Sequence, residues 1–183
     1  MKLKLPILIA LLIASLAILA SCGDEAAVSN SDWTADPYTA LVGVTSQLEV
    51  KDLPEGGSFF DSKVTDEESE NFLDAYTRGV TFKDANGESD ISCVESFGLY
   101  IPAGDKATNI GIMKAKSQED VAAVKELAER VIANVQTKFK SYIPDQDKIA
   151  QKTKVETNGL YVYYVVAQDV NKIADMLKVE LAK

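Results

Sequence analysis

The chain has 183 residues with 28 acidic and 19 basic side chains, a net charge of −9, and no histidine. The excess of acidic residues argues against nucleic-acid binding, which needs a basic surface. The lack of histidine excludes Ser-His-Asp and Cys-His catalysis, as well as histidine metal sites.

The first 21 residues predict a segment that is removed from the mature protein. Two lysines precede an apolar run over residues 5–19, which is short for a membrane span of about 20 residues. The sequence Leu-Ala-Ser-Cys at 19–22 resembles a bacterial lipobox. This resemblance implies cleavage after Ser21 and a diacylglycerol on Cys22, which would hold the chain on the outer face of the cytoplasmic membrane. An ordinary secretory signal or an uncleaved anchor is the alternative.

Residues 22–36 are small, polar and acidic, and they predict a flexible tether to a single domain over residues 37–183. Trp33, the only tryptophan, lies near the end of this tether and is a candidate to dock on the domain. If Cys22 carries the lipid, Cys93 has no partner within the chain, so we expect no disulfide. We expect Cys93 to be a small buried residue instead.

Two helices are predicted at the start of the domain. The first begins at Asp36, because a helix cap is followed there by proline at the first helical position. The second is predicted over residues 66–78, because Thr65 and Glu68 have the spacing of a capping box. Gly79 is then expected to follow its last turn.

The remainder of the domain predicts the order β-β-α-β-β-α. The strands are expected from about 91 to 101 and over 109–116, 149–157 and 160–167, with helices over 117–142 and after Asp169. Asn158-Gly159 predicts a tight hairpin, and the strand over 160–167 is apolar on both faces and should be central. We therefore predict an α+β fold with an antiparallel sheet of about four strands, helices on one face and preceding N-terminal helices.

Three segments together resemble an uncharacterised family of lipid-anchored proteins known as domain of unknown function 4358. They are Leu99-Tyr100-Ile101-Pro102, Tyr142-Ile143-Pro144 and Gly159-Leu160-Tyr161-Val162. The resemblance covers about residues 65–180 and departs at Asn109, where the family pattern leads us to expect an acidic residue. It implies a location and a domain type but no activity.

Residues 84–95 have the spacing of a calcium-binding EF-hand loop. The candidate oxygen ligands are Asp84, Asn86, Glu88, Asp90 and Glu95. However, Ser89 occupies the position that requires glycine, and the segment after Glu95 predicts a strand instead of the second helix. We therefore favour a polar Asn-Gly turn over a calcium site.

Tyr161 and Tyr163 are expected to share one face of the last strand. Such a pair can stack on a sugar or a peptide, but it more often packs against a helix or along the sheet. Packing is the interpretation we favour.

These patterns favour a non-catalytic, lipid-anchored binding or adaptor domain at the cell surface. A surface protein is a possible partner, nucleic acid is not, and no cofactor is expected beyond the diacylglycerol on Cys22. A calcium-dependent or cell-wall-associated structural module is one alternative. The other is an enzyme whose site the sequence does not reveal.

Overall fold

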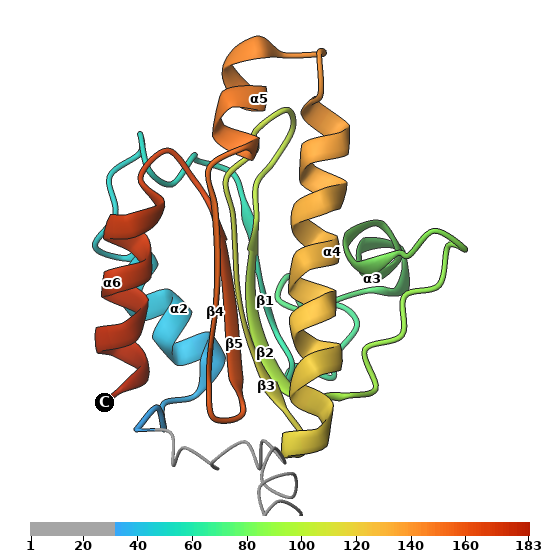
Figure 1. Cartoon of the computed structure of the whole chain (residues 1–183), viewed down its shortest axis with the longest axis vertical. Coiled ribbons are helices and arrows are strands. Elements are labelled where there is room, and N and C mark those ends of the chain that lie inside the picture. The colour runs from blue at the N-terminus through green and yellow to red at the C-terminus, as the bar shows by residue number, and fades with distance from the viewer. Residues whose placement is uncertain (1–31) are drawn as a thin grey trace, which may run out of the picture.

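A computed structural model describes residues 32–183 as a five-stranded antiparallel sheet with helices on both faces (Figure 1). The strands are β1 (Ser58–Asp61), β2 (Val94–Ile101), β3 (Asn109–Ala115), β4 (Thr153–Asn158) and β5 (Tyr161–Val166). The α-helices are α2 (Pro37–Thr45), α3 (Ala75–Phe82), α4 (Val121–Phe139), α5 (Pro144–Ala150) and α6 (Val170–Leu181). A short 3-10 helix, Gln118–Asp120, precedes α4.

The strands are arranged in the order β1-β2-β3-β5-β4. All six residues of β5 are buried, as expected for a strand that is apolar on both faces. Tyr161, Tyr163 and Val165 pack beneath α2 and α6, whereas Val162, Tyr164 and Val166 pack beneath α4. The α+β fold and the interior position of this strand are therefore confirmed.

The structure differs from the predicted fold in two details. The sheet has a fifth strand, β1, whose four residues at the sheet edge gave too short a pattern to recognise. Helices also cover both faces instead of one, because β3 and β5 bury apolar side chains in two separate cores.

The second predicted helix is displaced along the chain. Asp66 accepts a hydrogen bond from the Glu68 amide within a turn, so the expected capping box does not begin a helix. Asp74 caps α3 instead, because its carboxylate accepts the amides of Tyr76 and Thr77 at 2.8 and 2.9 Å. Gly79 consequently lies inside α3 and not beyond its end.

The segment between α4 and β4 also differs from the prediction. The helix α4 ends at Phe139, and Ser141 adopts a positive φ of 60°. Pro144 then begins α5, because its fixed φ suits the first position of a helix. As a result β4 begins at Thr153, and Ile149 belongs to a helix and not to a strand.

The start of the described chain is packed on the domain. Trp33 is buried with its ring 5.7 Å from that of Tyr163, and the amides of Thr34 and Ala35 donate to the carbonyl of Leu181. Residues 32–36 therefore belong to the folded domain and not to the predicted tether. The predicted signal segment, Ser21 and Cys22 lie outside the described residues. Between residues 32 and 183, no helix is long and apolar enough to cross a membrane.

The helix α2 lies directly on the sheet at Gly98 of β2. A Cβ atom at this position would lie 2.6 Å from the Cα atom of Tyr38 and 2.8 Å from the carbonyl oxygen of Pro37. Both atoms belong to the backbone, so the whole helix would have to move to admit a side chain.

We predict that Gly98→Ala lowers the free energy of unfolding by about 2–3 kcal/mol, because it overpacks this contact. The matched control is Gly79→Ala within α3, where an added Cβ atom meets nothing within 4 Å. The control should raise stability by roughly 0.5–1 kcal/mol, because alanine restricts the unfolded chain and favours the helix. Urea unfolding of both variants measures the difference, and equal effects would contradict the close contact.

Candidate functional site

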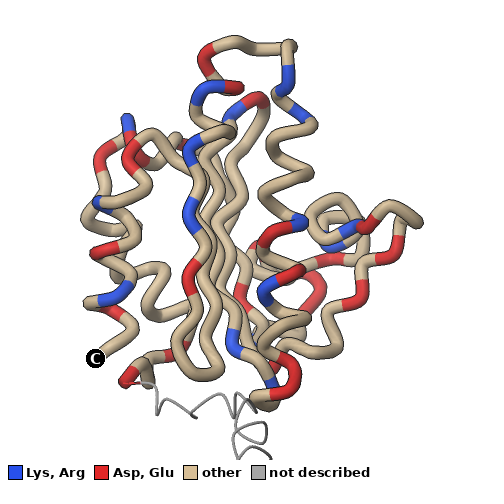
Figure 2. The backbone as a smooth tube through the Cα atoms, viewed as in Figure 1, with Lys and Arg blue, Asp and Glu red and all other residues tan. Residues whose placement is uncertain are grey.

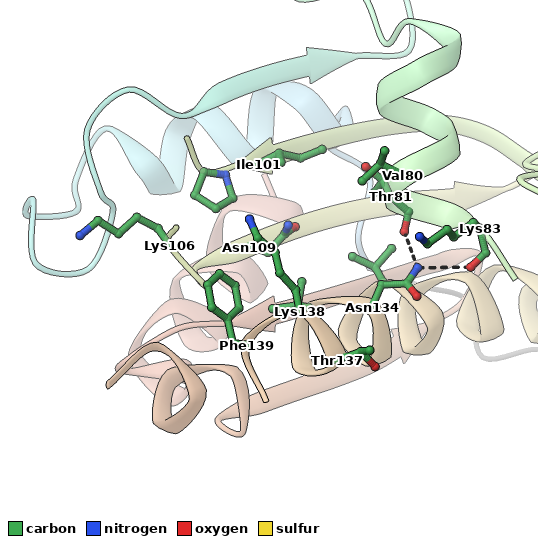
Figure 3. A pocket seen from close by; sticks show the side chains of 13 residues that line it. Val80, Thr81, Lys83, Ile101, Lys106, Asn109, Asn134, Thr137, Lys138 and Phe139 are labelled. Carbon is green, nitrogen blue, oxygen red and sulfur yellow. Dashed lines mark hydrogen bonds between the residues drawn. The ribbon is translucent and has the colours of Figure 1, made fainter. Parts of the chain in front are cut away.

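A pocket of about 330 Å³ lies between α3, the second half of α4 and the ends of β2 and β3 (Figure 3). Its apolar walls are formed by Val80, Ile101, Pro102, Val131, Val135 and Phe139. Its polar lining consists of Thr81, Lys83, Lys106, Asn109, Asn134, Thr137 and Lys138. We call this cavity the α3–α4 pocket.

The polar group deepest in the pocket wall is Asn109, which is only 5% exposed at the start of β3. The buried hydroxyl of Tyr164 donates to Asn109 Oδ1 at 2.9 Å. The ring of Tyr164 reaches this position by lying over Gly111, where a Cβ atom would be 2.2 Å from the ring. The hydrogen bond occupies the amide oxygen and leaves the amide nitrogen of Asn109 available to the pocket.

Side chains of α4 hold α3 in place as the opposite wall. Asn134 Nδ2 donates to the carbonyls of Thr81 and Lys83 at 3.1 and 3.2 Å (Figure 3). Arg130 donates to the carbonyl of Phe82 at 3.3 Å. These three carbonyls belong to the C-terminal end of α3, where helical partners are missing. The cation of Arg130 also suits the negative end of the helix dipole.

Three lysines surround the pocket, and none forms an ion pair with a described residue. Lys138 Nζ donates to the carbonyl of Gly104 at 2.9 Å and lies 5.0 Å from the centre of the Phe139 ring. Lys83 and Lys106 are exposed at the rim. Acidic residues are frequent in the loops that flank α3 (Figure 2), yet no described acidic side chain lines this pocket.

The lining of this pocket combines several kinds of polar group with apolar walls. Its described residues carry amide, hydroxyl and ammonium groups and no carboxylate or thiol. Such a mixture of apolar walls and a few convergent polar groups is typical of ligand pockets.

The EF-hand-like segment forms a turn. Asp84 Oδ1 accepts the amides of Asn86 and Glu88 at 2.8 and 2.9 Å, and Gly87 has a φ of 86°. The carboxylate of Asp90 instead accepts a hydrogen bond from the amide of Ser92. The carboxylate of Glu95 forms an ion pair with Lys114 at 3.1 Å. Within residues 32–183, no group of three or more acidic or cysteine side chains is placed to hold a metal ion. Glu88, Asp90 and Glu95 line one open hollow, but the five candidate ligands do not converge on a single point.

Tyr161 and Tyr163 do share a face, but both are buried beneath α6 and beside Trp33. Neither ring has a free surface on which a sugar or peptide can stack. Cys93 is half-buried and forms no disulfide with a described residue, and burial raises the pKa of its thiol. These three side chains have packing roles in the structure.

Sequence reasoning did not find the α3–α4 pocket. Lys83, Lys106 and Lys138 lie on three separate segments, and only the folded topology brings them around one cavity. The family pattern did single out Asn109, but as a departure and not as a ligand-facing group.

A second hollow lies at the other end of the sheet, where residue 32 joins the domain. It is lined by Trp33, Glu156, Asn158 and Lys178, among others. Burial alone would raise the pKa of Glu156, but Lys178 at 2.8 Å, the hydroxyl of Tyr163 and Lys154 at 3.0 Å together outweigh burial and lower this pKa to about 2. This end of the domain is held by ion pairs and by the packed Trp33.

Comparison with known proteins gives one match. The family model described as a domain of unknown function, DUF4358, matches residues 89–167. This part of the chain is similar to that domain. The DUF4358 match is shorter than the resemblance expected from the sequence, which extended over about residues 65–180. It includes β2 to β5 with α4 and α5, so it contains Asn109 and Lys138 but not the α3 wall of the pocket. No curated protein and no solved structure matches the chain.

We predict different outcomes for two neighbouring tyrosines within residues 89–167. Tyr164→Phe should lower the free energy of unfolding by about 1 kcal/mol, because Asn109 loses its hydrogen bond. Tyr163→Phe should lower it less, because the buried Tyr163 hydroxyl meets only the Glu156 carboxylate, without a well-formed hydrogen bond. Chemical denaturation of both variants tests this, and an equal loss in both would contradict the assigned bonding.

We also predict that Glu156→Gln lowers stability near neutral pH by about 1 kcal/mol, because two ion pairs are lost. The pKa of Glu156 is depressed from 4.5 in the unfolded chain to about 2 in the folded one. Its stabilisation is therefore complete above pH 4.5 and is lost as the pH falls towards 2. Melting curves of the variant and the wild type should converge over that interval. A constant difference down to pH 2 would contradict the role of this carboxylate.

Proposed function

We propose that the chain is a lipid-anchored, non-catalytic binding protein on the outer face of the cytoplasmic membrane, with the α3–α4 pocket as its binding site. The observation that carries this proposal is the pocket itself. Three lysines without ion-pair partners and the amide of Asn109 converge there on apolar walls, with no described carboxylate beside them. This arrangement favours holding a ligand over acid–base chemistry.

The lipobox at 19–22 supports the proposed anchor. With Cys22 acylated, residues 23–31 would span at most about 30 Å when extended. They join the domain at Asp32, which accepts a hydrogen bond from Asn158 at the β4–β5 hairpin. More than one acyl chain would make such anchoring stable.

The geometry of the sheet supports a pocket that is reached from the extracytoplasmic side. Asn109 pairs with Val166, whereas the hairpin beside Asp32 pairs Asn158 with Tyr161 at the opposite end of β5. The pocket and the proposed anchor therefore lie at opposite ends of the strands, as the path of β5 in Figure 1 shows. A ligand in the extracytoplasmic space can reach the pocket while the other end faces the bilayer.

We predict that Cys22→Ala releases the protein from the membrane, because the acyl acceptor is lost. Fractionation of cells into membrane and soluble material measures this directly. If the variant stays with the membrane, the apolar segment over residues 5–19 is itself the anchor and the lipobox interpretation is wrong.

We predict that a photo-crosslinking amino acid at Thr137 captures a discrete ligand on intact cells. Thr137 is exposed at the rim of the pocket, so the probe should reach a bound molecule without disturbing the fold. The matched control is Ala122, which is exposed near the start of the same helix and lies outside the pocket. Intact-mass analysis should show an adduct at Thr137 only. Equal labelling at both positions, or at neither, would contradict a binding site at this pocket.

A further inference from the structure

We infer that the ligand of the α3–α4 pocket is a small anionic amphiphile, in which one acid group is attached to an apolar body. This inference rests on the proposed function, since it names the class of molecule that the same pocket would hold.

The charges around the pocket favour an anion. Most lysines elsewhere in the described chain form an ion pair with a carboxylate. These ion pairs are distributed over the surface of the domain. Lys116, Lys140 and Lys152 lack such a partner among the described residues, and so do Lys83, Lys106 and Lys138, but only the last three line one cavity together. A positive group left unpaired beside an apolar surface attracts a negative ligand, and the low-polarity walls strengthen that attraction.

The hydrogen-bonding groups favour the same conclusion. Lys138 uses one N–H on the carbonyl of Gly104, which leaves two donors. Asn109 uses its oxygen on the hydroxyl of Tyr164, which leaves the N–H donors of the amide. Both side chains line the pocket, as Figure 3 shows. Their free groups are donors, and a carboxylate or phosphate has only acceptors to offer when ionised.

The size and lining of the pocket limit the apolar body to which the acid group of the ligand is attached. A volume of about 330 Å³ corresponds to roughly eleven water-sized heavy atoms. Val80, Val131 and Val135 belong to the apolar wall, and Figure 3 shows Val80 across the pocket from Lys106. An acid group held by Lys106 and Lys138 therefore leaves an apolar chain or ring to lie against this wall.

Four probes that share one apolar body test this inference. They are 4-phenylbutyrate, the neutral 4-phenylbutanamide, the cationic 4-phenylbutylamine and 4-phenylbutyl phosphate. Calorimetric titration into the mature lipoprotein in phosphatidylcholine nanodiscs measures binding, with empty nanodiscs as the blank. At least one of the two acids should bind about tenfold or more tightly than the amide, because it pairs with the lysines. The amine should not bind. The tighter acid identifies the head group as carboxylate or phosphate.

Substitutions in the pocket test whether its lysines are responsible for binding the acid. Lys106→Gln with Lys138→Gln should weaken binding of the acid about tenfold and leave that of the amide unchanged. The matched control, Lys125→Gln with Lys140→Gln, removes the same charge from α4 and its end but outside the pocket, and it should change nothing. Asn109→Asp should abolish binding of the acid, because it places a carboxylate in the pocket that can still accept the hydroxyl of Tyr164.

The outcomes separate the two proposals. The ligand is not an anion if the amide binds as tightly as the acid or more tightly, or if the two double-lysine variants lose equal affinity. The pocket would then still be a binding site, but for a ligand of another class. If no probe binds, the amphiphile inference is wrong, and crosslinking at Thr137 decides independently whether the pocket is a binding site.

Discussion

The burial of every side chain of β5 is the constraint on which the structure depends. A strand that is apolar on both faces requires a helix layer on each side, and α4 supplies one while α2 and α6 supply the other. The close contact of α2 at Gly98 and the ring of Tyr164 over Gly111 are both consequences of covering this sheet tightly. The α3–α4 pocket lies where α4 passes the end of β3 and α3 forms the opposite wall.

Much of the fold could be predicted from the sequence, because strand alternation, helix periodicity and the Asn158-Gly159 hairpin are local signals. The edge strand β1 was missed because four residues carry too little alternation. The position of α3 was missed because both Thr65 and Asp74 are residues that can cap a helix, and the sequence does not show that only Asp74 does so. Local patterns also do not determine on which face of a sheet a helix packs.

The candidate sites show the same limit. The calcium spacing at 84–95 was regular, but the oxygen of Asp84 is already occupied by two backbone amides of its own turn. The pocket has no sequence motif at all, since its lysines are about 20 to 30 residues apart and meet only through the sheet. The DUF4358 match contains the Asn109 side of the pocket but not α3, so the cavity joins the shared domain to a helix outside the match.

If the protein is held by its N-terminus, as proposed, the packing of residues 32–36 has a mechanical consequence. Thr34 and Ala35 bond to the carbonyl of Leu181 near the end of the chain, and Trp33 packs beside the rings of Tyr161 and Tyr163. A force applied between the membrane anchor and the domain would act on these contacts before it acts on the hydrogen bonds between the strands. Detaching residues 32–36 would lengthen the linker by about 15 Å and leave the five strands and the α3–α4 pocket intact.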